Sequence, residues 1–434
     1  MMGSSSGTYP WRERAPAVRE QDGKHQRGRR AHTALAVGLS FVAGLALAAC
    51  SSSSTPSATS TGPIKIGAVF DLTGPNSLIG QSDEKMAKLL INKQNADGGI
   101  GGRKIDLIVL DGQTQPAVGL SDVKQLVEQD HVVAMLGPDF TSTAEVIYPY
   151  LDQQKIPTVA DVGGGSWNSP APPYFFDIPE TDADVAEVTL GYMHLHGIRT
   201  LSWLGTEDGF GETGLAAFQK LAPQFGVTIE PVQTMQDSAT DVTPQLARLK
   251  AQGANALMIY TAGAPTVVAQ QNAAQLSLTE PVFQSNGAAL PQFLQAAGTS
   301  ANGIYLPGGN LQVASELPAS NPQKANIDAF LAMYGSANRF AGDMYDATTL
   351  LLRAIKAVGA SSTQIDSYLN NQVKNYAGVT GVMSFSSTIH AGILPSSLSI
   401  LKVENGTFHL AQSGSSILAS LSSSCPACLK GLPR

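Results

Sequence analysis

The sequence predicts an α/β protein of two Rossmann-like lobes, and three observations support this class. Short apolar strands alternate with amphipathic helices from Ile64 onward, which is typical of parallel sheets covered on both faces. The same alternation begins again near Asp182. The roughly 385 residues after position 49 exceed what one hydrophobic core usually serves. We therefore expect two lobes with an interlobe ligand cleft.

In the first lobe, a strand is expected at 64–70, followed by a turn at 72–75. A helix is expected at about 81–95, because Met86, Leu89 and Leu90 recur at helical spacing. Gly98 and Gly99 follow this helix and end it. The later elements alternate in the same way: a strand at 105–110, a helix through Leu120, Val123 and Val127, a strand at 132–136, a helix after Thr141 and a strand at 157–160.

The second lobe repeats the architecture with different residues. Its helices are expected at 182–196, 212–225, 242–252 and 265–276, and its strands at 201–204, 227–232, 256–260 and 281–285. A strand at 304–306 and a helix at 343–358 continue the pattern. The Asn405-Gly406 pair indicates a final hairpin. The serine-rich residues 413–434 are expected to form a disordered tail.

The N-terminus has the order of a bacterial lipoprotein signal. A basic leader with Arg27, Arg29 and Arg30 precedes an apolar run at 34–49, and Leu47-Ala48-Ala49-Cys50 is a small-residue cleavage site ending in cysteine. The run of about 16 residues is shorter than the ~20 of a membrane-spanning helix. Cys50 is thus the expected lipid attachment site, and 50–63 a flexible tether. A retained membrane anchor and an ordinary signal peptide remain as alternatives.

Charge and cysteine content narrow the function classes. Removing residues 1–49 takes away seven basic and three acidic side chains, which changes the formal net charge from −7 to about −11. Nucleic acid is therefore not an expected partner. Cys425 and Cys428 are expected either to form a local disulfide or to lie in a tail, and no thioredoxin-like pattern precedes them. His194 and His196 do not share a helix face, so no metal site is expected there.

Two loops of the first lobe are candidate binding sites. Thr141, Ser142 and Thr143 sit between a strand and a helix, where hydroxyls and free N–H groups favour a carboxylate. The alternative is that Thr141 or Ser142 simply caps the helix. The run from Val162 through Gly163, Gly164 and Gly165 to Trp167 allows a close backbone approach to a ligand, or forms only a flexible turn.

The sequence gives weaker evidence for a catalytic site than for a binding site. Gly209, Gly211 and Gly214 match the G-x-G-x-x-G spacing of dinucleotide-binding folds, but Glu207 and Asp208 would repel a pyrophosphate. Asp343 and Asp346 are interpreted as solvated or capping residues. Without a nucleophile, base or metal-ligand constellation, we expect no enzyme activity and no cofactor. An exported nucleotide-dependent enzyme remains a distant alternative.

Four segments resemble the type I periplasmic-binding-protein family, in particular the branched-chain amino-acid branch of ABC-transporter solute receptors. They lie, in the family's order, at 66–75, 98–105, 137–143 and 208–211. The resemblance covers roughly 64–411 and implies a hinged receptor that closes around a small solute. It also implies crossings between lobes near Pro179, Ala301 and Gly381. Lobe one would then be 64–181 plus 302–380, and lobe two 182–301 plus 381–412.

The resemblance also assigns site residues. It implies that the Thr141 and Ser142 loop holds a ligand carboxylate, that Val162, Gly163 and Gly164 line the cleft, and that the Phe210 ring faces the ligand from lobe two. Family members that bind amino acids supply an acid for the ligand's ammonium, and here Ala239 occupies that position. Asp237 is the candidate substitute; without it, an organic acid fits better than an α-amino acid.

The implied function is that of a monomeric, lipid-anchored receptor on the extracytoplasmic face of the membrane. Its partners would be a small solute and an ABC permease with its ATPase. A ligand-presenting subunit of a membrane sensor is the alternative.

Overall fold

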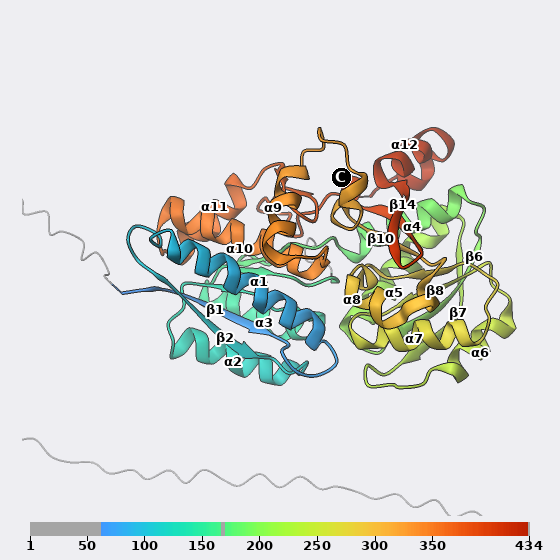
Figure 1. Cartoon of the computed structure of the whole chain (residues 1–434), viewed down its shortest axis with the longest axis horizontal. Coiled ribbons are helices and arrows are strands. Elements are labelled where there is room, and N and C mark those ends of the chain that lie inside the picture. Colours follow the sequence, from blue (N-terminus) through green and yellow to red (C-terminus); the bar gives the residue numbers. More distant parts are fainter. Residues whose placement is uncertain (1–61, 166–169, 433–434) are drawn as a thin grey trace, which may run out of the picture. The chain divides into compact units, whose positions relative to one another are not determined.

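The computed structural model describes residues 62–165 and 170–432 (Figure 1). These residues contain a five-stranded sheet, a seven-stranded sheet and a short two-stranded sheet. We call the five-stranded sheet with its helices lobe one, and the seven-stranded sheet with its helices lobe two. The predicted signal segment 1–49, the lipid attachment residue Cys50, most of the predicted tether and Trp167 lie outside the described residues.

Lobe one is built on a parallel sheet with the strand order β2-β1-β3-β4-β5. Its strands are β1 (Ile64–Phe70), β2 (Ile105–Asp111), β3 (Ala134–Leu136), β4 (Thr158–Ala160) and β5 (Phe175–Asp177). Its helices are α1 (Ser77–Ala96), α2 (Pro116–Glu128), α3 (Thr141–Gln154), α9 (Lys324–Tyr334), α10 (Arg339–Val358) and α11 (Ser362–Gln372). The two-stranded sheet consists of β11 (Tyr376–Ala377) and β12 (Val382–Met383).

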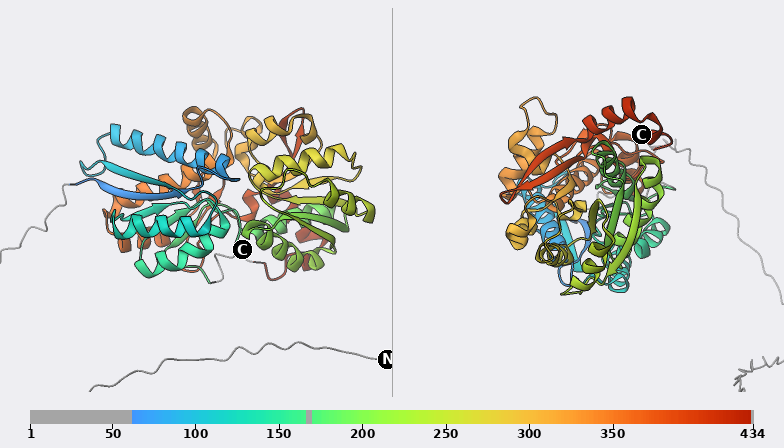
Figure 2. Two further views of the ribbon diagram at one scale, coloured as in Figure 1. Left: turned by 90° about the horizontal axis from the view of Figure 1, so that it is seen from below. Right: turned by 90° about the vertical axis from the view of Figure 1, so that its right-hand side faces the viewer.

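Alternation along β1 explains how helices cover both faces of this sheet. Ile66, Ala68 and Phe70 pack into a core with side chains of α1, α10 and α11, whereas Val69 packs with α2 and α3 on the other face. The two layers of helices are visible in Figure 2. Successive side chains of a strand point to opposite faces, so a continuous apolar strand predicts a sheet buried on both sides.

Lobe two has the order β14-β13-β10-β9-β8-β6-β7, in which β13 and β14 are antiparallel additions to a parallel sheet. Its strands are β6 (Thr200–Thr206), β7 (Thr228–Met235), β8 (Ala256–Tyr260), β9 (Val282–Gln284), β10 (Tyr305–Gly308), β13 (Ser399–Glu404) and β14 (Thr407–Ser413). Its helices are α4 (Asp182–Leu195), α5 (Gly209–Leu221), α6 (Thr243–Gln252), α7 (Ala264–Gln275), α8 (Pro291–Ala297) and α12 (Gly414–Ser424). The fold class expected from the sequence is confirmed.

Two expected crossing points differ from the structure. The segment at 302–308 was assigned to lobe one, but β10 pairs with β9 and β13 of lobe two. Residues after Gly381 were assigned to lobe two, yet Met383, Phe385 and Ile393 pack in the core of lobe one. The return to lobe two falls between Ile393 and Leu398, which packs in the core of lobe two. Apolar segments of similar composition serve both sheets, so sequence pattern does not distinguish their lobes.

The expected disordered tail was also wrong over most of its length. Residues 414–424 form helix α12, which begins with Ser413 accepting a hydrogen bond from the Ser416 N–H group. Ile417 and Leu421 are fully buried and pack in the same core as α4. These two residues, four apart, form one apolar helix face, and burial of that face outweighs the serine-rich composition. The expected local disulfide between Cys425 and Cys428 follows the helix.

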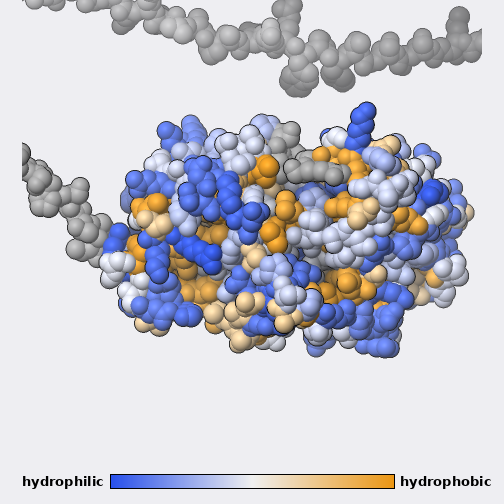
Figure 3. Space-filling view, turned by 90° about the horizontal axis from the view of Figure 1, so that it is seen from above, coloured by the Kyte–Doolittle hydropathy of each residue, from blue (hydrophilic) through white to orange (hydrophobic). Residues whose placement is uncertain are grey.

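Exposed large hydrophobic side chains come from separate parts of the chain. They are Leu78, Val146, Ile389, Leu394 and Leu410. On the face in Figure 3, hydrophobic areas are interspersed with hydrophilic ones. Within the described ranges, no helix is both long and apolar enough to cross a membrane.

Candidate functional site

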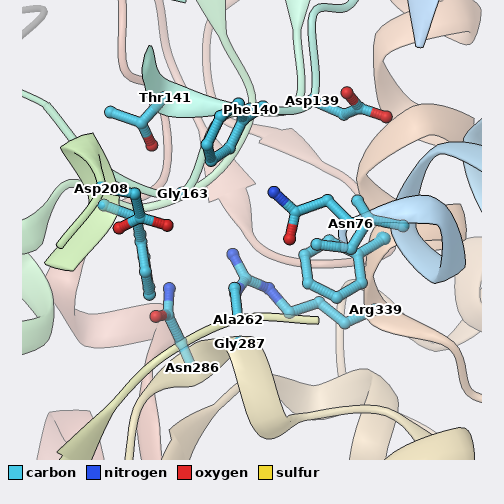
Figure 4. A pocket seen from close by; sticks show the side chains of 13 residues that line it. Asn76, Asp139, Phe140, Thr141, Gly163, Asp208, Ala262, Asn286, Gly287 and Arg339 are labelled. Carbon is cyan, nitrogen blue, oxygen red and sulfur yellow. The ribbon is translucent and has the colours of Figure 1, made fainter. Parts of the chain in front are cut away.

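A cavity of about 20 Å³ lies at the carboxyl ends of strands from both lobes (Figure 4). Its lining residues follow β1, β3 and β4 in lobe one and β6, β8 and β9 in lobe two, and α10 adds its first two residues. This is where open α/β sheets bind ligands. The polar lining residues are Asn76, Asp139, Thr141, Asp208, Asn286 and Arg339. The larger apolar ones are Ile79, Phe140, Phe210 and Phe340.

Thr141 opens helix α3 at the cavity, and it does not cap the helix. The N-cap residue is Phe140, and no side chain caps this terminus. The first N–H group of the helix to bond within it belongs to Ala144, so the three preceding N–H groups stay available. Thr141 is 2% exposed, and it lines the cavity. The loop therefore offers donors to an acceptor in the cavity.

Ser142 has a different role from its neighbour. Its Oγ accepts a hydrogen bond from the Gly209 N–H group of lobe two at 2.9 Å. A Cβ atom on Gly209 would lie 2.9 Å from this oxygen, so the close approach of α5 to α3 requires glycine. Ser142 thus joins the lobes directly.

Residues of the glycine loop after β4 also have different roles, some at the cavity and one in the core. Gly163 lines the cavity, and a Cβ on Gly164 would lie 3.1 Å from Thr141 Oγ1 and 3.2 Å from the Phe210 ring. Val162 is fully buried, and its N–H group donates to Asp177 Oδ1 at 2.9 Å. Val162 therefore anchors the loop in the core of lobe one, and the glycines leave room for the neighbouring groups.

Phe210 reaches the cavity from the first turn of α5. Its ring stacks on Tyr260 at a centroid distance of 4.7 Å, and Tyr260 stacks on Trp203 at 5.1 Å. The Tyr260 hydroxyl donates to Asp182 Oδ1, which fixes the central ring of the stack. We refer to Trp203, Tyr260 and Phe210 as the aromatic stack.

Asp237 does not line this cavity. It follows β7, the edge strand of the sheet in lobe two, so its loop lies one strand beyond the loop after β6. Burial, then the nearby carboxylates of Asp208 and Glu207, raise the pKa of Asp237 to about 7. The acids that do line the cavity are Asp139 and Asp208, which the sequence reasoning did not select.

Arg339 is the cation of the cavity lining, and the sequence analysis missed it. Asn338 caps α10 by accepting the Ala341 N–H group, which places Arg339 in the first turn. The guanidinium Nη2 lies 3.1 Å from Glu180 Oε1, and Nε lies 3.3 Å from Asp343 Oδ2. The i,i+4 spacing of Arg339 and Asp343 could have indicated this ion pair from the sequence. The burial of the pair, however, depends on the tertiary fold.

Glu180 links the lobes behind this arginine. Its Oε1 also accepts a hydrogen bond from Asn286 Nδ2 of lobe two at 2.6 Å. Glu180 therefore contacts both the Arg339 guanidinium of lobe one and Asn286 of lobe two.

A chain of buried carboxyl groups lies beside Arg339. Asp83, Asp161 and Asp343 are at most 1% exposed, and the oxygens of Asp83 and Asp161 accept no hydrogen bond from an N–H group among the residues that the structure describes. Burial, followed by the charge of Asp161, raises the pKa of Asp83 well above its usual value. Burial also raises the pKa of Asp343 to about 7, against the lowering effect of Arg339. Because side chains of Asp83 and Asp343 both interact with Asp161, these acids are stable together only when they share protons.

Asp343 and Asp346 are interpreted from the sequence as solvated or capping residues, but neither is solvated. Both are fully buried. Asp346 Oδ2 accepts the N–H groups of Val379 and Thr380 at 2.7 and 3.1 Å, so it holds the loop between β11 and β12.

The G-x-G-x-x-G segment has a packing explanation. The Asp208 carboxylate occupies the N-terminus of α5, where its Oδ1 accepts the Gly211 N–H group at 2.7 Å. A Cβ on Gly211 would collide with the backbone of Thr206, and one on Gly214 would collide with the Tyr260 ring. An acid at the helix terminus excludes the pyrophosphate that this spacing otherwise binds.

The fold and the interlobe cavity define a two-lobed ligand receptor. The chain belongs to the periplasmic binding protein family, whose model matches residues 63–407, and within it to the branched-chain amino-acid branch of type I proteins. The resemblance inferred from the sequence is thereby confirmed.

Three known proteins illustrate this relationship. The Leu/Ile/Val-binding protein homolog 3 of Brucella melitensis is 23% identical over 301 residues, which is 69% of this chain and 80% of the relative. The substrate-binding protein of a branched-chain amino acid transporter from Streptococcus pneumoniae, solved with isoleucine, is 22% identical with a TM-score of 0.70. That alignment covers 81% of this chain and 99% of the other. A solute-binding protein of an R. palustris ABC transporter, solved with benzoate, is 17% identical with a TM-score of 0.70, over 81% of this chain and 96% of the other.

Proposed function

We propose that the protein is a lipid-anchored extracytoplasmic receptor that binds a small carboxylate-bearing solute between its lobes and delivers it to an ABC importer. The observation that carries this proposal is the first turn of α3 at the cavity wall. There, unbonded N–H groups and the Thr141 hydroxyl face the same space as the rings of Phe140, Phe210 and Phe340.

The helix terminus favours an anion over a neutral group. Free N–H groups and the positive end of the helix dipole act together on a carboxylate, and the buried Thr141 hydroxyl adds one donor. The positively charged Arg339 guanidinium lines the same cavity and favours the same charge. The three phenylalanine rings suit an aliphatic or aromatic body attached to that carboxylate. The relatives solved with isoleucine and with benzoate carry ligands of both kinds.

Binding requires the lobes to separate first. A cavity of about 20 Å³ has room for little more than one water molecule. The Ser142–Gly209 hydrogen bond and the contact of Asn286 with Glu180 hold the lobes together around it. Opening of these contacts admits the solute, and closure covers it.

The proposed lipid anchor at Cys50 explains how such a receptor reaches its transporter. A receptor held at the membrane by a flexible tether meets a permease and its ATPase at high effective concentration. Replacement of Cys50 by Ala is expected to release a receptor that still binds its solute.

Calorimetry with matched ligands tests the proposed carboxylate site. The panel contains leucine, isoleucine, benzoate and aliphatic acids, each paired with its neutral amide. We expect one acid to bind with micromolar or tighter affinity while its amide does not, because only the acid carries the charge. For the acid that binds, Thr141→Val is expected to weaken binding roughly 10- to 100-fold, since a hydrogen bond to a charged group is lost.

Thr143→Val is the matched control, since Thr143 lies two residues further along α3, is equally buried and does not line the cavity. Equal affinity for an acid and its amide, or equal loss in the two variants, would remove the carboxylate assignment.

A further inference from the structure

A second group of ligating side chains lies outside the solute cavity, at the C-terminal segment. A ring nitrogen of His194 and the sulfur atoms of Cys425 and Cys428 all lie within 4.8 Å of one another. Among the residues that the structure describes, this is the group of histidine, cysteine and acidic side chains close enough to hold a metal ion. In the structure, the two cysteines form a disulfide.

A backbone contact fixes the tautomer of the histidine ring. His194 lies in the last turn of α4, and its Nδ1 lies 2.7 Å from the Phe225 carbonyl oxygen. The ring therefore donates from Nδ1, which leaves the Nε2 lone pair free. Histidines that bind metals usually donate their other nitrogen to a backbone carbonyl in this way, which fixes the tautomer and the direction of the ring.

The cysteines lie on a turn that brings both sulfurs to the same side. The Cys428 N–H group donates to the Cys425 carbonyl at 2.9 Å, and the Cα atoms are 5.4 Å apart. Gln224 Nε2 holds the turn by donating to the Cys428 carbonyl at 2.7 Å. Two thiolates bound to one Zn²⁺ stand about 3.8 Å apart, a separation that a C-x-x-C turn accommodates.

Two helix C-termini lie at this group. Cys425 is the C-cap residue of α12, and His194 lies in the last turn of α4, where its carbonyl oxygen accepts a hydrogen bond from the Arg199 guanidinium. Cys428 is fully buried, whereas Cys425 and His194 are partly exposed. Such a site holds a metal ion firmly on one side and leaves a coordination position open to water on the other.

We propose that the reduced C-terminal segment is a Zn²⁺ site with His194 Nε2 and the thiolates of Cys425 and Cys428 as ligands, alternating with the disulfide. A dithiol donor reduces the disulfide: two electrons and two protons pass to the cysteines, and the donor becomes a disulfide. Zn²⁺ then displaces the two thiol protons and binds both sulfurs and the imidazole.

The two forms constrain the C-terminal segment differently. The disulfide closes the turn on itself, and the metal ion ties the same turn to His194. Reduction without metal removes both constraints, so Leu429 and its neighbours remain held only by apolar contacts and by Gln224.

Cobalt titration of the full chain tests this site, because tetrahedral Co²⁺ bound by thiolates has visible and charge-transfer absorption bands. The chain carries Cys50→Ser so that only Cys425 and Cys428 supply thiols, and a phosphine reduces it under native conditions. We expect uptake of about one Co²⁺ per chain with thiolate charge-transfer bands, and its displacement by Zn²⁺. The oxidised protein should take up none.

Two histidine variants separate the proposed ligand from its surroundings. His194→Gln should weaken Co²⁺ binding at least about tenfold, as expected for loss of one of three ligands. His196→Gln should bind normally, because His196 lies on the same helix but stacks on Tyr192 and is not part of the group. Circular dichroism checks that each variant stays folded.

Three outcomes would overturn the proposal: a disulfide that the phosphine cannot reduce in the folded protein, a reduced protein without thiolate-to-cobalt bands, or equal affinity in the two histidine variants. Solute binding is measured in parallel and should be unchanged in all forms.

Discussion

The two lobes differ in the acids that they bury, because lobe one contains carboxyl groups without a hydrogen-bond donor beside others, such as Asp177 and Asp346, that have one. In lobe two, Asp182 accepts hydrogen bonds from Tyr260 and Gly165, and Asp208 accepts them from Gly211 and Thr206. In lobe one, Asp83 and Asp161 are buried without such donors. A donor lowers the cost of burying a carboxylate, whereas an acid without one must remain protonated.

This difference assigns separate physical roles to the two walls of the cleft. Lobe two presents Phe210 from an aromatic stack whose position depends on apolar packing and one hydrogen bond. Lobe one presents Arg339 in front of acids whose charge depends on pH. We therefore expect lobe two to provide an apolar surface fixed by the aromatic stack and lobe one the polar surface around Arg339. Acids with raised pKa values occur in both lobes, including Asp182 and Asp237 of lobe two.

The largest expected effect comes from removing the buried cation of lobe one. Arg339→Met leaves Glu180 and the acids beside it without their counter-charge, which is expected to lower the free energy of unfolding by about 3–5 kcal/mol at pH 7.5. Urea denaturation measures this loss. The double variant Arg339→Met with Asp343→Asn should recover part of it. A loss below about 1 kcal/mol in the single variant would contradict the role of Arg339 as the compensating charge.

The next largest expected effect is a change of stability with pH. Burial raises the pKa of Asp343 and Asp346 to about 7 and that of Asp71 to about 6, so the folded state holds more protons than the unfolded state between pH 4 and pH 7. Stability should therefore fall as pH rises through this window, by about 1.4 kcal/mol per pH unit for each extra proton held. Thermal unfolding at pH 5.5 and pH 7.5 measures the change.

One variant in each lobe sharpens this pH comparison. Asp83→Asn should stabilise the protein by about 1–3 kcal/mol at pH 7.5, since an amide replaces a buried acid without a donor. Asp182→Asn in lobe two should destabilise it, because the Tyr260 hydroxyl and the Gly165 N–H group lose a charged acceptor. Loss of stability in both variants would contradict the proposed difference between buried acids with and without hydrogen-bond donors.

The smallest expected effect comes from the aromatic stack. Phe210→Leu keeps an apolar side chain but removes the ring that stacks on Tyr260, which is expected to lower stability by about 1 kcal/mol. Its pH dependence should match that of the original protein, because no titratable group changes. A changed pH slope in this variant would contradict the assignment of the pH dependence to titratable side chains outside the aromatic stack.

Local patterns predicted much of the fold because they depend on few neighbours. The apolar strand at 64–70, the paired glycines at 98–99 and the Asn405-Gly406 turn all appear where expected. The cavity loop at Thr141 was also predictable, since a strand followed by hydroxyl residues and a helix leaves unbonded N–H groups at a sheet edge.

The remaining features depend on which segments meet. Arg339 lies about 160 residues from Glu180 in sequence, and only the return of α10 to lobe one brings them into contact. Helix α12 has a polar composition, and its two buried residues acquire their importance from α4. Asp237 does not line the cavity, because it follows β7, which is the edge strand of its sheet.

The sequence alone therefore determined the alternation of strands and helices, the membership of a two-lobed receptor family and one donor-rich loop at the cleft. These features follow from periodicity and from backbone groups at helix ends, which are local. The tertiary structure decided which acids are buried, which cation compensates them and which side chains close the cleft. Those outcomes depend on desolvation and on contacts between distant segments, and neither is a property of a short stretch of sequence.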